Sequence, residues 1–204
     1  MRFMDRLIFA ESLDRSADGS RGRFTMNFKN WICLQEIKNS TTLMQSNVDY
    51  NQFIDWAKSE ADKVNPDKEK FLNFEFQWAE AANNVKLVAY ENDMPLGYVG
   101  LEKFEDGYKI NTLGVKPEAR GKGLASVMYD FILSKTKLYS DVMQTPEAKS
   151  LWVKLANKYR VLGYNRSSKQ NFNVTAQGKE LLSTDPEFVL YADEENDNFL
   201  VASK

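Results

Sequence analysis

The segment Arg120-Gly121-Lys122-Gly123 places two bases and two glycines between a β-prone run and an apolar helical stripe. The N-terminus of a helix presents free backbone N–H groups and the positive end of its dipole, so it attracts anions. Glycines let that backbone approach phosphate oxygens closely, and the two bases add charge beside them. The segment therefore predicts a phosphate-binding loop, with a simple turn flanked by solvated bases as the alternative.

The sequence around this loop predicts that it connects a strand to a helix. Three β-prone runs, at 86–91, 96–102 and 108–115, are separated by turn residues and predict an antiparallel meander. After the loop, apolar residues recur at helical spacing, at Leu124, Val127, Met128, Phe131 and Ile132.

Another strand and another helix are expected after that helix. Residues 138–143 are β-prone, and Thr145-Pro146 then provides an N-cap and a first helical residue. On the N-terminal side, residues 31–37 predict a strand. Asn47 or Asp49 is expected to cap a helix that ends before Pro66.

Two segments are harder to assign. Residues 68–83 fit both a strand and a helix, and we predict a helix. Residues 159–202 look rich in strands, with a last hairpin formed by 187–192 and 198–202. The resulting order of strands and helices predicts a mixed α/β fold.

The composition excludes several kinds of site. No histidine occurs, which excludes hydrolases with a histidine base and most catalytic zinc sites, and we expect no bound metal. Proton transfer must then use carboxylates, tyrosine, lysine, a chain terminus or water. The single cysteine, Cys33, excludes an internal disulfide framework and lies in an apolar run typical of a buried thiol.

Charge and hydropathy favour a cytoplasmic protein. The net charge of −2, with acids and bases interspersed, argues against a dedicated nucleic-acid binder, although a local basic patch stays open. The first residues lack the apolar run of a signal peptide, and no segment approaches the length of a membrane span. We therefore expect a cytoplasmic location and no membrane partner.

Two motifs carry a family resemblance. Arg120-x-x-Gly123-x-Ala125 matches the pattern Q/R-x-x-G-x-G/A, and Leu113-Gly114-Val115-Lys116-Pro117 is similar to L-x-V-x-P. Together with the order of elements over about residues 86–156, they resemble the GCN5-related N-acetyltransferases, the GNAT superfamily. The resemblance implies an acyl-CoA N-acyltransferase fold.

The resemblance also implies a domain organisation. We expect a single domain over 1–204 with its core at about 31–165. Residues 1–30 then form an extra N-terminal segment, and 166–204 add C-terminal strands.

The same resemblance implies a reaction and its binding residues. Acetyl-CoA is the expected co-substrate, and the amine of an acceptor attacks its thioester directly. In relatives, the backbone of the signature loop binds the CoA pyrophosphate and the preceding strand pairs with the pantetheine arm. The corresponding residues here are Leu113, Gly114, Val115, Arg120, Gly121, Lys122, Gly123, Leu124 and Ala125.

The proton-transfer residues are less clearly implied. Many relatives carry a glutamate on the strand before the loop, but 108–115 has none, so Glu102 is the expected base, with Glu105 or bulk solvent as alternatives. Relatives also carry a tyrosine acid on a later helix. One register places Trp152 there as a core residue, and the other makes Tyr159 the acid.

Other functions stay open at this point. The missing strand glutamate and the displaced tyrosine favour a GNAT-fold module that binds CoA or a protein without catalysis. The run from Ser140 to Trp152 resembles GNAT-like proteins of bacteriophages, some of which modify DNA bases. Ser140 and Asp141 are expected to contact the acceptor, and the sequence specifies neither that acceptor nor the size of the acyl group.

Overall fold

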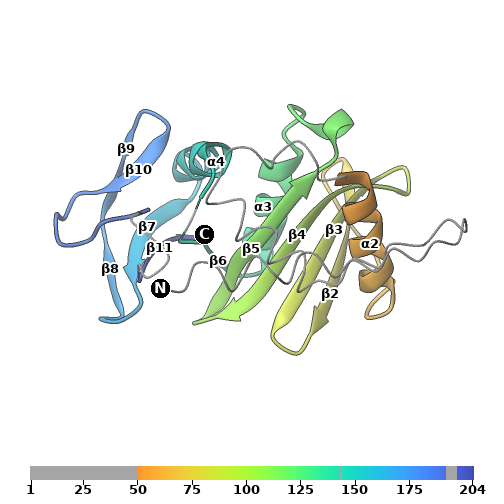
Figure 1. Cartoon of the computed structure of the whole chain (residues 1–204), viewed down its shortest axis with the longest axis horizontal. Coiled ribbons are helices and arrows are strands. Elements are labelled where there is room, and N and C mark those ends of the chain that lie inside the picture. The colour runs from red at the N-terminus through yellow and green to blue at the C-terminus, as the bar shows by residue number, and fades with distance from the viewer. Residues whose placement is uncertain (1–49, 143, 192–196) are drawn as a thin grey trace, which may run out of the picture. The chain divides into compact units, whose positions relative to one another are not determined.

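Nine strands form one mixed sheet in the part of the chain that the structure describes (Figure 1). The structure is a computed structural model that describes residues 50–142, 144–191 and 197–204, all within the unit Met44–Lys204. The order in the sheet is β1-β2-β3-β4-β5-β6-β11-β7-β8, and β9 and β10 pair separately. The strands are β1 (Glu69–Phe71), β2 (Phe74–Ala81), β3 (Asn84–Glu91), β4 (Met94–Phe104), β5 (Gly107–Val115), β6 (Lys137–Tyr139), β7 (Arg160–Asn165), β8 (Gln170–Phe172), β9 (Val174–Gln177), β10 (Glu180–Ser183) and β11 (Asn198–Ser203).

The described helices lie on both faces of the sheet (Figure 1). They are α2 (Tyr50–Asp62), the short 3-10 helix η2 (Pro117–Ala119), α3 (Leu124–Lys135) and α4 (Pro146–Ala156). On one face, Phe53 of α2 meets the ring of Tyr98 edge-on, with centroids 5.3 Å apart. On the other, α3 packs so closely that a Cβ at Gly97 would lie 3.0 Å from the Met128 sulfur. No described helix is long and apolar enough to cross a membrane.

The predicted meander is confirmed. Strands β2 to β5 pair antiparallel in chain order, joined by tight turns. Asn92 and Asp93 turn β3 into β4 with φ values of 50° and 63°, the left-handed conformation that such two-residue hairpin turns require. The helices expected from Leu124 and from Pro146 are also present.

The helix predicted over 68–83 is wrong, since this segment forms β1 and β2. Alternate residues of β2 face α3, where the ring of Phe76 stacks on that of Phe131 at 4.5 Å between centroids. The residues between them face α2, which buries Gln77 completely. The spacing of the apolar residues fits both the helix and the strand period, and the segment is a strand because it forms hydrogen bonds with β3.

The predicted last hairpin is also wrong. Residues 187–191 are not a strand, and residue 192 lies outside the described residues. β11 instead inserts between β6 and β7 and pairs antiparallel with both. The strand predicted at 31–37 and the cap at Asn47 or Asp49 lie outside the described residues, so the single domain over 1–204 stays a prediction.

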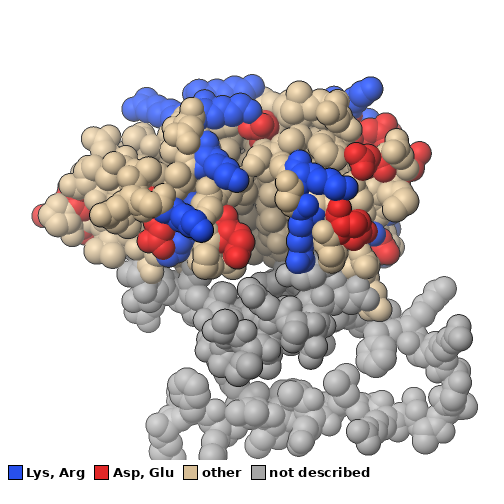
Figure 2. All heavy atoms as spheres, turned by 90° about the horizontal axis from the view of Figure 1, so that it is seen from above, with Lys and Arg blue, Asp and Glu red and all other residues tan. Residues whose placement is uncertain are grey.

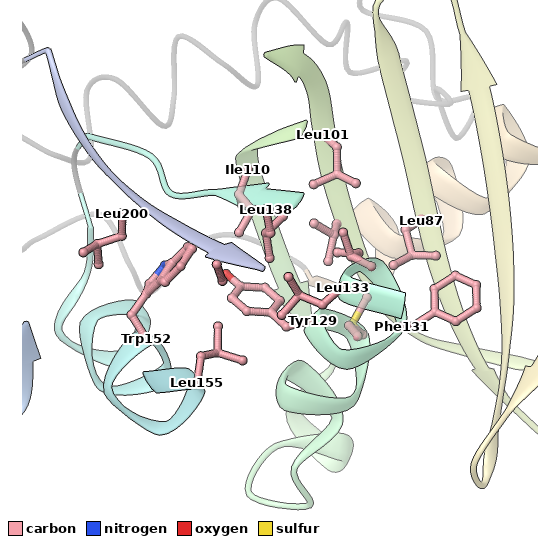
Figure 3. Close-up of a cluster of buried hydrophobic side chains, with 14 of the residues drawn as sticks. Leu87, Leu101, Ile110, Tyr129, Phe131, Leu133, Leu138, Trp152, Leu155 and Leu200 are labelled. Carbon is pink, nitrogen blue, oxygen red and sulfur yellow. The ribbon is translucent and has the colours of Figure 1, made fainter. Parts of the chain in front are cut away.

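Helices α3 and α4 share a core with the sheet (Figure 3). Trp152 of α4 is only 1% exposed, and its ring meets Tyr129 of α3 edge-on at 6.3 Å. Leu138 of β6 and Leu200 of β11 are fully buried beside them. The expectation that Trp152 is a core residue is confirmed.

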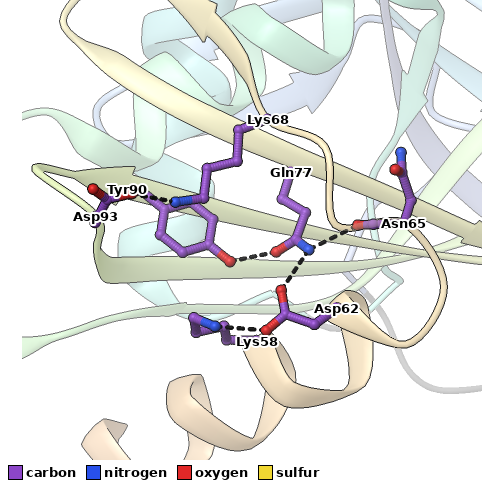
Figure 4. A network of polar contacts seen from close by, with 7 residues as sticks. All are labelled: Lys58, Asp62, Asn65, Lys68, Gln77, Tyr90 and Asp93. Carbon is purple, nitrogen blue, oxygen red and sulfur yellow. Dashed lines mark hydrogen bonds and ion pairs between the residues drawn. The ribbon is translucent and has the colours of Figure 1, made fainter.

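A buried polar network fixes the end of α2 to the sheet (Figure 4). The Gln77 amide nitrogen donates to Asp62 Oδ1 at 2.8 Å and to the Asn65 carbonyl at 2.7 Å. The Tyr90 hydroxyl donates to Gln77 Oε1. Because every one of these groups has a partner, α2 is held in one position over β2 and β3.

Candidate functional site

Strands β5 and β6 separate part-way along the sheet. They are parallel and pair only from Gly107 to Lys109 and from Lys137 to Tyr139. β5 then continues to Val115, while β6 ends. Beyond Lys109, the edge of β5 that faces β6 has no strand partner in the described part of the chain, so its backbone groups can pair with an extended ligand.

A β-bulge lies where the two strands separate. Gly100 of β4 pairs with Thr112 and Leu101 pairs with Ile110, which leaves Asn111 as the extra residue of β5. A bulge bends its strand and increases the local twist. The bend therefore directs β5 away from β6 at the level of Asn111.

The loop between β5 and α3 contains two glycines in the left-handed conformation. Gly121 and Gly123 have φ values of 74° and 81°, which L side chains rarely adopt, and a Cβ at either would meet no atom within 4 Å. Gly123 is the N-cap of α3 and provides no side-chain cap. The glycines are thus required by the backbone angles, and the space in front of them is open to a ligand.

Contacts with β5 and with α2 hold this loop in place. The Arg120 Nε donates to the Val115 carbonyl at 3.1 Å, which ties the loop to the end of β5. The buried Lys116 ammonium lies 3.1 Å from Asp55 Oδ1 of α2.

Figure 2 views the side of the molecule toward which β5 runs. Lys and Arg side chains are spread over this side, with Asp and Glu side chains between them.

Glu102 lies on β4 beside the bulge. The Asn111 amide donates to its Oε2 at 2.8 Å, and the Lys109 ammonium lies 3.2 Å from its Oε1. Its side chain is 38% exposed. The carboxylate is therefore oriented from β5, yet still accessible to a substrate.

The sequence model of the Acetyltransferase (GNAT) family matches residues 50–142, which include the meander, the separation of β5 and β6, and the loop. Residues 50–142, just under half of the chain, are therefore similar to the GNAT family. No curated protein matches the chain.

Several solved structures are similar to the chain at low sequence identity. An acetyltransferase from Thermus thermophilus is 12% identical with a TM-score of 0.35, and the match covers 59% of this chain and 64% of that one, just under two thirds. The ribosomal-protein-S18-alanine N-acetyltransferase of Escherichia coli is 9% identical with a TM-score of 0.36, covering 72% and 86%. A GNAT acetyltransferase from Elizabethkingia anophelis with acetyl-CoA bound is 12% identical with a TM-score of 0.32, covering 78% and 91%.

Ser140 marks the end of β6 in this GNAT fold. Its N–H donates to the Leu200 carbonyl at 2.8 Å, and its hydroxyl accepts from the Leu200 N–H at 3.0 Å. The hydroxyl thus replaces a strand carbonyl and is fully buried. Asp141 follows at the separation, where its Oδ1 accepts from the Val142 N–H at 2.8 Å.

Tyr159 lies apart from the residues around the separation of the GNAT strands. Its hydroxyl donates to Asp130 Oδ1 of α3 at 2.8 Å. It precedes Arg160, which pairs with Ser203 at the end of the sheet where β5 and β6 are still paired. Burial, and then the bond to Asp130, raise the pKa of Tyr159.

Asn111 is the residue of this candidate site that the sequence did not single out. The signal was present as two adjacent polar residues, Asn111 and Thr112, between the apolar Ile110 and Leu113. Strict alternation would place only one polar residue there, so the pair indicates a bulge. The structure places Asn111 of β5 at the level where β5 and β6 separate, with Glu102 beside it on β4, and Ser140 and Asp141 directly after the end of β6. Tyr159 lies apart from them, at the start of β7.

Proposed function

We propose that the protein is an N-acyltransferase that moves an acetyl or other acyl group from CoA to an amine. The observation that carries the proposal is the edge of β5 beyond Lys109, which has no strand partner among the described residues and leads directly into the open glycine loop at the start of α3. An extended chain with amide groups pairs with such an edge, and a pyrophosphate binds at such a loop. Acyl-CoA combines both features in one molecule.

In this proposal the chain binds the two parts of CoA with backbone groups. The loop from Arg120 to Ala125 receives the pyrophosphate at the N–H groups of the first turn of α3, and the residues from Leu113 to Val115 pair with the pantetheine amides. Arg120 and Lys122 add positive charge. CoA supplies the activated thioester, and the protein contributes orientation and proton transfer.

Glu102 is the proposed base. It lies on β4, across β5 from the separation where the thioester would lie, and its carboxylate accepts a proton from the ammonium of the acceptor, directly or through one water. Lys109 and Asn111 hold it in place. We further propose that Asp141 borders the acceptor site, while the buried Ser140 hydroxyl fixes the end of β6 beside it. The acid stays a prediction, because the hydroxyl of Tyr159 is already donated to Asp130.

Calorimetric titration with CoA and acetyl-CoA tests the binding step. One-to-one binding is expected, and an absence of heat with both would contradict the proposal. The transfer step is tested by thiol release from acetyl-CoA with a panel of small amines, an aminoglycoside and a peptide. Release that depends on one of these acceptors supports an enzyme.

One observation favours a second function. Trp152 fills the helix position of the expected tyrosine as a buried core residue, and Tyr159 lies away from the separation. These features suit a module that binds CoA without transfer. Tight CoA binding without thiol release for any acceptor would support this second function.

A further inference from the structure

A cavity of about 530 Å³ lies on the face of β6, β11 and β7 opposite α3 and α4. Tyr139 and Val201 line it, whereas their neighbours Leu138 and Leu200 point into the core shared with the two helices. The turn between β4 and β5 forms one side, with Glu105 and Asp106. This volume is within the range of small-molecule sites in proteins, about 300–1,000 Å³.

Both carboxylates of the cavity are already neutralised. The Lys137 ammonium and the Tyr139 hydroxyl donate to the two oxygens of Asp106, the second at 2.7 Å. Lys169 lies 2.5 Å from Glu105 Oε1. These donors lower the pKa of Asp106 and of Glu105, so both stay ionised and paired near neutral pH.

Besides these paired lysines and carboxylates, the lining of the cavity contains the guanidinium of Arg160. Arg160 lines the cavity from β7, and its guanidinium makes no hydrogen bond or ion pair with the residues that the structure describes. Ser203 is its register partner on β11, and Asn171 lines the cavity from β8. A guanidinium flanked by a hydroxyl and an amide is suited to a carboxylate or phosphate, which it binds through two parallel hydrogen bonds.

The rest of the lining accommodates an apolar body. Leu162 and Val201 lie side by side in register on β7 and β11. The rings of Tyr139 and Tyr164 meet edge-on at 5.5 Å and belong to the same lining. Aromatic and aliphatic walls with a few placed polar groups are typical of sites for small organic ligands.

The cavity is separate from the CoA loop. Arg160 of β7 pairs with Ser203 of β11, and the residue before Ser203, Ala202, pairs with Leu138 of β6. Arg160 is therefore level with the paired ends of β5 and β6. The loop follows Val115, and the strand from Lys109 to Val115 spans about 20 Å. An occupant at Arg160 therefore does not touch the loop.

We propose that this cavity binds a small organic anion, with its carboxylate or phosphate on Arg160 and its apolar body on Leu162, Val201 and the two tyrosine rings. The site takes its ligand independently of CoA. Its ligand contacts Tyr139, the last residue of β6 that pairs with β5.

The test uses the full chain and three probes of similar size: benzoate, phenyl phosphate and benzyl alcohol. Calorimetry and amide NMR shifts are measured with and without saturating CoA. Both anions, or one of them, are expected to bind one-to-one, with benzyl alcohol at least about tenfold weaker. The anion that binds more tightly shows whether the site prefers a carboxylate or a phosphate. Equal binding of the alcohol, or no binding of either anion up to about 10 mM, would overturn the proposal.

The matched variants are Arg160→Gln and Lys154→Gln. Lys154 is an exposed cation on α4 that also makes no ion pair with the described residues. R160Q is expected to weaken anion binding about tenfold or more, and K154Q to leave it unchanged. Unchanged binding by R160Q, or loss of anion binding when CoA is added, would refute a separate site. If R160Q unfolds at a lower temperature, R160K replaces it and is expected to weaken binding to a smaller extent.

Discussion

Glu102 shows how single residues define the proposed chemistry. Each of its oxygens has one donor on β5, Lys109 for Oε1 and Asn111 for Oε2. The neighbouring strand therefore sets the direction of the carboxylate. A base held in this way needs no histidine, which the chain lacks.

Replacing this carboxylate tests its role as base. Glu102→Gln keeps the shape and the Asn111 contact but removes the proton acceptor, so kcat is expected to fall about 10²–10⁴-fold with the CoA affinity unchanged. Glu91→Gln, at an exposed position at the end of β3, is the control. If E102Q has the wild-type rate, solvent removes the proton.

Gly123 and Gly178 allow a matched test of the loop. Both have positive φ and open space in front of them, with values of 81° and 64°. Alanine at either position costs about 1–2 kcal/mol of backbone strain. Both variants should therefore lose stability in denaturant unfolding, but only Gly123→Ala should weaken CoA binding in calorimetry. Equal CoA affinity for the two variants would argue against the loop as the phosphate site.

The sequence predicts Tyr159 as the acid, whereas in the structure its hydroxyl donates to Asp130 of α3. Its bond to the carboxylate of Asp130 joins the end of α4 to α3. Tyr159→Phe is expected to lower the free energy of unfolding by about 1–3 kcal/mol and to change kcat by less than about tenfold. Stopped-flow measurements of thiol release give the rate. A fall in kcat of a hundredfold or more would restore Tyr159 as the acid.

At the scale of elements, the position of α2 depends on Gln77. This buried side chain joins Asp62, Asn65 and Tyr90. Gln77→Leu leaves the Tyr90 hydroxyl without its acceptor, so a loss of about 1–3 kcal/mol in unfolding free energy is expected. The double variant Gln77→Leu/Tyr90→Phe removes both partners and should recover part of that loss. A double variant that is less stable than Q77L would show that the network does not act as described.

At the scale of the whole chain, paired carboxylates determine how stability depends on pH. Donors from lysine are the largest cause of lowered pKa values at Glu60, Asp62, Glu80, Asp93, Glu105 and Asp106. A carboxyl whose pKa is lowered by folding contributes stability above its unfolded pKa and loses it as pH falls through the folded value. The midpoint of thermal unfolding should therefore fall progressively below about pH 5. A midpoint that stays constant to about pH 3 would contradict this account.

The sequence by itself determined the elements of the meander, the two helices that follow it and the residues of the glycine loop. These are local properties, since turn residues, apolar periods and glycines act over a few neighbours. The tertiary structure decided that residues 74–81 are a strand, because only pairing with β3 resolves a pattern that fits both periods. It also inserted β11 between β6 and β7 and made Asn111 the bulge that orients Glu102. Each of these depends on pairing between different segments of the chain, which the pattern along one segment does not contain.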